Sequence, residues 1–437
     1  MHASAKFLVV ACLAIGATSR LHAADLHVPA DHSSIQAALD AAVDGDSVVV
    51  APGRYYENLR FPPRAIHLRS SDGPLRTSIY GRQMETVVTF EGVPTRDSII
   101  EGFTITDGLD PEGRKAGGIH IDQGGAAVVR GNIIRQNLGY GAGHGISLNY
   151  PGAALIERNE IRHNRGGPGV SGGGGGGGIG IRGSACPLAS ACVAEIQNNY
   201  IGNNQVTNFS SGGGINLNGA KVNVVSNILE FNYASGNGGG LASANGSYAL
   251  VEGNLFYANR AQWQGGGIDS SVSQGDRGPW LINNTFVDNE AMSGSAAHLS
   301  GFDGGTRVAN NLIRAIGTGV ALECRIGNVS VPPPTLHNNV YSPNGIAFGG
   351  RCSGLTGVDG NISSPPIFRS ETDFGLHPAS PGVDQGNDSL SSRATDLSGR
   401  PRVMDGDGDG ISIIDMGAYE LPGPNYVFDD GFEAHER

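Results

Sequence analysis

The chain has 437 residues, of which 70 are glycine and 16% are charged, and its formal net charge is −12. Glycine is about twice as frequent as the ~7% of an average protein, and charged residues fall below the usual ~25%. The sequence has no strict Gly-X-Y period, which excludes collagen, and its three lysines leave no stretch typical of a helical bundle. The acidic balance argues against nucleic acid and anionic membranes as partners.

The first 23 residues have the pattern of an export signal. Lys6 supplies the positive start, residues 7–17 are mostly apolar, and residues 21–23 (Leu-His-Ala) form a cleavage site before Ala24. The apolar run is too short to span a bilayer, and no later segment approaches about 20 apolar residues. We therefore expect a secreted, extracellular or cell-surface protein that has no transmembrane segment once residues 1–23 are removed.

The middle of the chain repeats a short pattern built around asparagine. Each copy has an aliphatic residue three positions before the asparagine and an apolar residue two positions after it. A second asparagine follows five positions later, except at Ile316. Most copies are 27 to 30 residues apart, and one gap is 40 residues long. The repeated asparagines are Asn132, Asn159, Asn199, Asn227, Asn254, Asn284, Asn311 and Asn339.

A period near 28 residues, with short alternating apolar segments and glycine-rich turns, is typical of a solenoid whose unit is one coil of strands. Helical repeats would need ten or more residues of 3.6-residue periodicity in each unit, and the sequence lacks them. In a parallel β-helix, equivalent residues of successive coils stack about 4.8 Å apart. We therefore predict an all-β fold with aliphatic columns inside and asparagine ladders at a bend.

A further strand precedes each asparagine pair and follows the glycines, and its alternation predicts two outward polar columns. We expect this flat face to be the place where a linear polymer lies. The first column contains His120, Ser147, Gly180, Asn216, Ala242, Asp269 and His298. The second contains Asp122, Asn149, Arg182, Asn218, Ala244, Ser271 and Ser300.

Over roughly residues 25–364, the chain resembles the pectin-lyase-like superfamily of right-handed parallel β-helix proteins. Residues 34–42 (Ser-Ile-Gln-Ala-Ala-Leu-Asp-Ala-Ala) are similar to the helix that caps the first coil in that superfamily, with a serine as N-cap. Residues 48–55 and 101–105 are similar to its first coils. The resemblance implies a single right-handed β-helix over residues 24–364 with an N-terminal capping helix. It also implies a protein that binds or processes polysaccharide or a cell-surface glycan.

The end of the chain resembles a second known element. Residues 373–384, 396–402 and 415–420 are similar to the choice-of-anchor Q region that follows β-helices in secreted bacterial proteins. This resemblance implies an irregular C-terminal region over residues 365–421 and a bacterial protein of the cell surface, outer-membrane association included. The tail, residues 422–437, resembles short tails of other exported bacterial proteins, and a sorting role and an unstructured end both stay open.

Four cysteines remain after the signal, and an even number in an exported chain favours disulfides over metal binding or thiol catalysis. Cys324 and Cys352 are 28 residues apart, which is one coil, so stacking brings their backbones to the distance of a disulfide. Cys186 and Cys192 lie in the coil of 40 residues, and we expect them to close its loop. Buried free thiols are the alternative interpretation.

Catalytic candidates lie on the two polar columns. An enzyme of this fold that cleaves acidic polysaccharide by β-elimination needs a base beside the substrate carboxylate and a cation to stabilise the developing charge. The residues that offer such groups are His120, Asp122, Arg182, Asp269 and His298. None of them matches a pectate lyase's catalytic arginine motif, and ordinary exposed polar groups are the alternative interpretation.

A sixth candidate is His144, in a Gly-His-Gly segment that resembles the corresponding motif of polygalacturonases. The other marks of that motif are paired aspartates upstream and Arg-x-Lys downstream, and only Asp122 and Arg182 stand in those places here. The first enzyme hypothesis is thus a polysaccharide lyase and the second a polygalacturonase-like glycoside hydrolase. A non-catalytic cell-surface or adhesion solenoid is the alternative to both.

Calcium is the one cofactor that the sequence suggests. Asp405, Asp407 and Asp409 alternate with glycines, which is the spacing of the first three ligands of a calcium loop. The acid expected at the twelfth position is replaced by Met416, and Asp415 stands one position early. A calcium site formed by Asp405, Asp407, Asp409 and Asp415 and an acidic turn without metal therefore both stay open.

Overall fold

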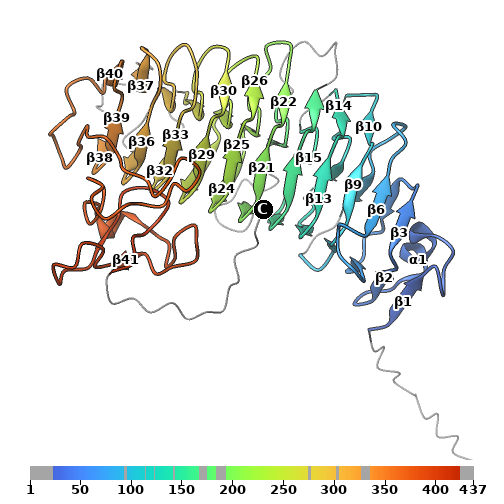
Figure 1. Cartoon of the computed structure of the whole chain (residues 1–437). Coiled ribbons are helices and arrows are strands. Elements are labelled where there is room, and N and C mark those ends of the chain that lie inside the picture. The colour runs from blue at the N-terminus through green and yellow to red at the C-terminus, as the bar shows by residue number, and fades with distance from the viewer. Residues whose placement is uncertain are drawn as a thin grey trace, which may run out of the picture.

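The structure is a computed structural model, and almost all of its regular elements are short strands stacked into long sheets (Figure 1). It describes residues 23–92, 96–113, 115–122, 124–140, 143–166, 175–183, 193–273, 277–301, 305–325 and 335–423. Within these ranges there is one α-helix, α1 (Ile35–Ala41), and one 3₁₀ turn, η1 (Asp388–Leu390). No helix in the described part of the chain is long and apolar enough to cross a membrane.

Three large parallel sheets form the solenoid. Sheet A contains, in order, β1 (Asp25–Val28), β2 (Ser47–Val50), β5 (His67–Ser70), β8 (Ile99–Glu101), β12 (Val128–Arg130), β16 (Leu155–Glu157), β20 (Ala194–Gln197), β24 (Lys221–Val225), β28 (Tyr248–Glu252), β32 (Trp280–Ile282), β35 (Arg307–Ala309) and β38 (Thr335–Leu336). Sheet B contains β3 (Gly53–Tyr55), β6 (Thr77–Tyr80), β9 (Thr104–Thr106), β13 (Ile133–Arg135), β17 (Glu160–Arg162), β21 (Tyr200–Gly202), β25 (Ile228–Glu230), β29 (Leu255–Tyr257), β33 (Thr285–Val287), β36 (Leu312–Arg314) and β39 (Asn339–Tyr341). Sheet C contains β4 (Leu59–Phe61), β7 (Val88–Glu91), β11 (Ile119–Asp122), β15 (Ile146–Asn149), β19 (Ile179–Arg182), β23 (Ile215–Asn218), β27 (Leu241–Ala244), β31 (Ile268–Ser271), β34 (Ala297–Ser300), β37 (Val320–Arg325) and β40 (Ile346–Gly350).

A smaller sheet D closes part of each middle coil between sheets B and C. Its two-residue strands are β10 (Leu109–Asp110), β14 (Leu138–Gly139), β18 (Arg165–Gly166), β22 (Gln205–Val206), β26 (Tyr233–Ala234) and β30 (Arg260–Ala261). One coil therefore runs through sheets C, A, B and D, and successive coils pair in register. For example, Ile134 pairs with Ile161 and Ile161 with Ile201, and all three are fully buried. The predicted parallel β-helix with aliphatic columns inside is confirmed.

Two ladders of buried asparagines hold the bends at either end of sheet B. Asn159 Nδ2 donates to Val129 O of the preceding coil (2.8 Å) and to Asn199 Oδ1 of the next (3.0 Å). The first ladder joins Asn132, Asn159, Asn199, Asn227, Asn254, Asn284, Asn311, Asn338 and Asn361. The second joins Asn137, Asn164, Asn204, Asn232, Asn259 and Asn289. The predicted ladders are thus present, with each amide paired between coils.

The prediction is wrong at one rung, because Asn338 and not Asn339 continues the first ladder. Asn339 lies one residue further, at the start of β39, where it pairs with Leu312. This register places Val340 in the interior with no exposed surface and leaves the larger Tyr341 half-buried. Packing therefore decides between two adjacent asparagines that the repeat pattern alone does not separate.

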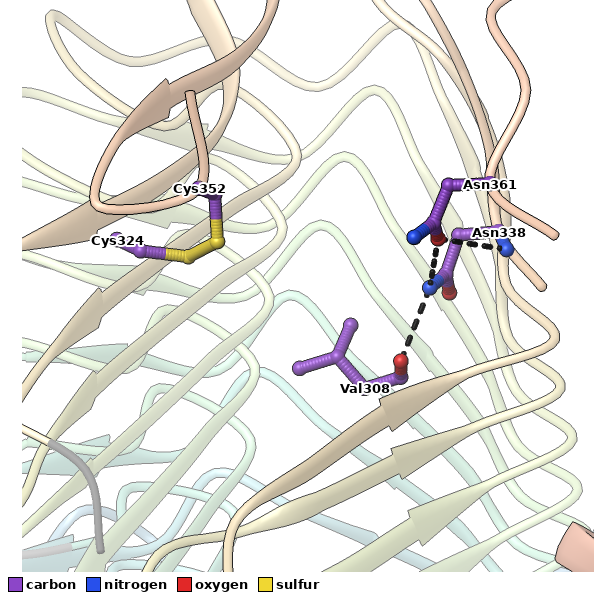
Figure 2. The surroundings of a disulfide bond; sticks show 5 residues. All are labelled: Val308, Cys324, Asn338, Cys352 and Asn361. Carbon is purple, nitrogen blue, oxygen red and sulfur yellow. Dashed lines mark hydrogen bonds between the residues drawn. A yellow bond between two sulfur atoms is a disulfide. The ribbon is translucent and has the colours of Figure 1, made fainter. Parts of the chain in front are cut away.

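A helix covers the first coil of the solenoid, and a disulfide joins its last coils. At the first coil, α1 packs against β1, β2 and β4, and the Ser34 side chain caps it by accepting from Ala37 N (3.1 Å). At the last coils, Cys324 and Cys352 form the predicted disulfide, with their Cα atoms 5.4 Å apart (Figure 2). Figure 2 also shows the last rungs of the first ladder, where Asn338 Nδ2 donates to Val308 O (2.9 Å). The predicted Cys186–Cys192 pair lies outside the described residues.

Residues 365–423, which we call the C-terminal region, fold back along the outside of the last coils (Figure 1). This region is irregular apart from η1 and the antiparallel pair β41 (Val403–Met404) and β42 (Ile413–Ile414). A small apolar cluster joins it to the solenoid, in which Leu312 of sheet B packs with Leu376 and Met416. The predicted similarity to a choice-of-anchor region stays a prediction.

Candidate functional site

Sheet C carries the first polar column in the predicted register, but this column is not an open surface. His120 pairs with Ser147, and Asp269 pairs with His298, as the alternation predicts. The side chains of His120 and His298 are nevertheless only 1% exposed, and Asp269 is 6% exposed. The expectation that this column is an open outward face is therefore wrong, and polymer binding along sheet C stays a prediction. The second column, with Asp122 and Arg182, is half-buried over most of its length.

The cover comes from the segment that precedes each strand of sheet C. Ala116 N donates to Ser147 Oγ (2.8 Å), so the backbone before β11 crosses over the next strand of the column. The Asn237 side chain bonds to Asp269 in the same way. The chain passes so close to the column that only glycine fits at this corner. Gly294 has a left-handed backbone, and a Cβ on it would stand 2.7 Å from His298 Cβ. The glycine-rich corners thus fold over the polar column.

The three candidate histidines on or beside sheet C, His120, His144 and His298, are buried. His298 Nδ1 lies 2.7 Å from Asp269 Oδ1, and burial raises the pKa of this aspartate. His120 Nδ1 lies 2.7 Å from Ser147 Oγ, and its Nε2 is 3.7 Å from Asp122 Oδ2. Burial lowers the pKa of His120 to about 4, and that of His144 also to about 4. The catalytic roles of the six candidates stay predictions, and the structure gives His120, His144 and His298 no direct access to a polymer.

The outer face of sheet B, by contrast, forms an open groove. Every strand of this sheet from β9 on has three residues, of which the middle one points inward, as Ile161 and Ile201 do. Residues in the left-handed conformation flank the strands, with Arg158 (φ 52°) and His163 (φ 54°) on one coil. Their side chains form two parallel rows, and the strands form the floor between them. We call this feature the sheet B groove; its volume is about 620 Å³, and it is lined by Arg158, Asn159, Glu160, Arg162, His163, Asn198, Tyr200 and Asn203.

Arginines make one end of this groove positive in a protein whose net charge is −12. Arg158 and Arg165 are exposed, and Arg162 pairs in register with Arg135 of the preceding coil. Glu160 forms an ion pair with Arg162 and compensates one of these charges. Partial burial and then the charges of the surrounding arginines lower the pKa of His163. This imidazole is therefore mostly uncharged at neutral pH, beside several guanidinium groups.

An aromatic ring lies on the groove floor next to the arginines. A Cβ on Gly202 would stand 2.5 Å from Tyr200 Oη, 2.7 Å from Cζ and 2.8 Å from Cε1, so the ring of Tyr200 lies across Gly202. Tyr200 Oη also donates to Glu230 Oε1 (2.6 Å), and this bond holds the ring along strand β21, over Gly202. Tyr200 is half-buried. The groove therefore offers guanidinium groups and a flat aromatic surface side by side.

Three carboxylates form a second candidate site in the C-terminal region. Ligand oxygens of Asp384, Asp405 and Asp407 all lie within 4.8 Å of one another. Asp384 Oδ2 accepts from Asp407 N (2.8 Å), and this contact brings the two turns together. Asp409 is exposed and Asp415 is outside the group, because its carboxylate accepts from the backbone amides of Asp384 and Leu421. The structure thus groups two of the four predicted calcium ligands with an aspartate that the sequence interpretation missed.

The sheet B groove was also missed, although the sequence contains a signal for it. Arg158, Arg162 and Arg165 lie within eight residues of a chain in which only 16% of residues are charged. Arg158 and His163 each precede a ladder asparagine, and that is the position which takes the left-handed conformation in coil after coil. The position before each ladder asparagine is therefore the sequence feature that places these side chains in two rows.

Comparisons with known proteins agree with the architecture. A family model described as a right handed beta helix region matches residues 117–331. The crystal structure of pectate lyase Pel9A is similar with a TM-score of 0.53 and 13% identity, over 91% of this chain and 96% of that one. A mannuronic acid specific polysaccharide family 6 lyase from human gut microbiota gives a TM-score of 0.41 and 13% identity, over 75% of this chain and 83% of that one. The curated proteins contain no match. The chain is therefore a right-handed parallel β-helix.

Proposed function

We propose that this chain is an exported bacterial β-helix protein, secreted or held at the cell surface, that binds an anionic polysaccharide in the sheet B groove. The observation that carries the proposal is the groove itself, where Arg158 and Arg162 lie beside the Tyr200 ring on an otherwise acidic protein. A guanidinium group binds a carboxylate or sulfate through two parallel hydrogen bonds. The tyrosine ring gives a flat apolar surface for the face of a sugar.

The rows of left-handed residues set the direction of the bound chain. They run along the solenoid axis, so a ligand between them crosses successive coils, each about 4.8 Å from the last. Arg162 on β17 and Tyr200 on β21 lie on neighbouring coils. A linear polymer thus places one part against the arginines and the next part over the ring.

Binding measurements with polygalacturonate, alginate and neutral dextran test this proposal. We expect both anionic polymers to bind more weakly as salt rises, and dextran not to bind. The double variant Arg158→Gln/Arg162→Gln should weaken binding at least tenfold. Arg260→Gln is the matched control, because Arg260 is exposed on sheet D and pairs with Glu290 outside the groove. Equal binding of dextran, or unchanged binding by the double variant, would overturn the proposal.

A polysaccharide lyase is the second candidate function, and His163 favours it. β-Elimination beside a carboxylate needs a base and a nearby positive charge, and an imidazole of lowered pKa among arginines supplies both. The same polymers, incubated with and without a chelator, show whether unsaturated products form. We expect His163→Gln to abolish product formation while binding persists. Binding without product in the parent protein would leave the non-catalytic function.

We further propose that calcium binds between Asp384, Asp405 and Asp407. Carboxylate oxygens are the ligands that calcium prefers, and the grouping of three of them supports the proposal. Added calcium should raise the melting temperature, and Asp407→Asn should remove that shift. Asp409→Asn is the matched control, because this neighbour lies outside the group. Absence of a shift in the parent protein would contradict calcium binding.

A further inference from the structure

The sheet B groove does not run the whole length of the solenoid, because the C-terminal region covers the later strands. Thr285 and Leu312 are only 1% exposed and Val287 is fully buried, although all three point outward from sheet B. Ala418 N donates to Thr285 Oγ1 (2.8 Å). Apolar contacts complete the cover, since Val287 packs with Phe374 and Leu312 with Met416.

Hydrogen bonds fix this cover to several coils. Gly417 N donates to Asn310 O (2.7 Å), and Asn387 N donates to Asn310 Oδ1 (2.9 Å). On the coil before, Asn283 Nδ2 donates to Asp415 O (3.1 Å). One coil earlier still, the Glu252 carboxylate accepts from Ser391 and Ser392 and is 1% exposed. The C-terminal region is therefore a fixed wall at this end of the groove.

An aromatic pocket stands where the groove meets this wall. Its volume is about 510 Å³, and it is lined by Ile228, Glu230, Phe231, Leu255 and Tyr257 of the solenoid and by Thr372, Asp373, Phe374 and Tyr419 of the C-terminal region. The Tyr257 ring lies 4.8 Å from the Phe374 ring and 5.1 Å from the Phe231 ring, measured between centroids. The Tyr200–Glu230 hydrogen bond joins this pocket to the arginine end.

We propose that the groove is closed at this end and that it binds the end of a polysaccharide chain, whose terminal sugar occupies the aromatic pocket. The inference rests on the proposed binding of an anionic glycan in the same groove. A chain that lay across its middle would have to continue along sheet B over Thr285 and Leu312, where the C-terminal region fills the space. The following sugars then lie over Tyr200 and reach Arg158 and Arg162.

Chain length tests the inference on the parent protein. Short galacturonate oligosaccharides and long polygalacturonate are titrated, and each dissociation constant is expressed per chain and per sugar unit. A site for chain ends predicts the same value per chain for both ligands. A constant value per sugar unit would overturn the inference and leave the proposed function intact. Failure of both ligands to bind would remove the proposed function and the inference together.

A pair of tyrosines from one column gives a second, independent readout. Tyr257 and Tyr341 occupy equivalent positions on sheet B, with Val287 and Arg314 between them, so Tyr341 lies beyond the wall. We expect Tyr257→Ala to weaken binding of the short oligosaccharides at least threefold and Tyr341→Ala to leave it unchanged. Equal effects of the two variants would contradict a pocket for the terminal sugar.

Discussion

Replacing Gly202 by alanine tests the role of the Tyr200 ring. The added Cβ would stand 2.5 to 2.8 Å from three atoms of that side chain, and its three nearest neighbours include no backbone atom. Tyr200 must therefore leave the groove floor, while strand β21 keeps its place. Since Gly202 is not in the left-handed region, alanine is accepted there without backbone strain.

The expected stability change is small and the expected binding change is larger. Loss of the Tyr200–Glu230 hydrogen bond lowers the free energy of unfolding by about 1 kcal/mol. The lower chain entropy of alanine in the unfolded state raises it by about 0.4–1 kcal/mol. The free energy of unfolding should thus change by less than about 1 kcal/mol. A contact of one aromatic ring is worth about 1 kcal/mol, so the dissociation constant for polygalacturonate should rise about fivefold.

Calorimetric titration and urea unfolding measure the two quantities on the same samples. Tyr200→Phe is the matched control, because it keeps the ring and loses the hydroxyl that donates to Glu230. This variant should bind nearly as well as the parent protein. Unchanged binding by Gly202→Ala would refute the stacking role of Tyr200. A loss of about 3 kcal/mol in stability would show that the strand, and not the ring, had moved.

Three further predictions concern stability. Asn254→Ala removes side-chain hydrogen bonds to buried groups on both neighbouring coils, among them the bond from Asn227 N, and should cost about 3 kcal/mol, whereas the surface variant Asn218→Ala should cost under about 0.5 kcal/mol in the same urea titration. Cys324→Ser opens a loop of 28 residues and should lower the free energy of unfolding by about 3.5 kcal/mol without weakening polygalacturonate binding; an equal loss of binding would contradict a purely structural disulfide. Burial raises the pKa of Asp415 to about 7, so the stability from this group is complete below its ordinary pKa of 3.8 and is lost as pH rises through 7. The melting temperature should therefore fall between about pH 4 and 7 and level off above pH 7, more steeply in the parent protein than in Asp415→Asn, and parallel curves would refute this assignment.

The fold was predictable from the sequence because the same residue pattern recurs in every coil of a solenoid. The spacing of asparagines and aliphatic residues predicts the coils, the ladders and the column in which Asp269 lies beside His298, and the structure has all of these. The error at Asn339 arose where two asparagines are adjacent and only the packing of Val340 separates them. The spacing of asparagines and aliphatic residues therefore determines where each coil lies in the sequence. Where two asparagines are adjacent, the volume of the inward side chain determines the register.

The site was harder to predict, because it depends on parts of the chain that the strand alternation does not describe. Alternation places His120 outward, but the segment with Ala116 then covers that face. Arg158 is a bend residue, and its direction follows from the left-handed backbone at the position before each ladder asparagine, which the strand alternation does not describe. Asp384 joins Asp405 through a contact between two turns, which spacing along the chain does not specify.

A crystal structure with a bound galacturonate oligosaccharide is the most direct test of the central claim. It should show sugar carboxylates within hydrogen-bond distance of the Arg158 and Arg162 guanidinium groups, a sugar ring over Tyr200, and the terminal sugar beside Tyr257. An oligosaccharide bound on sheet C, or one that passes over the outer face of β33, would contradict the account.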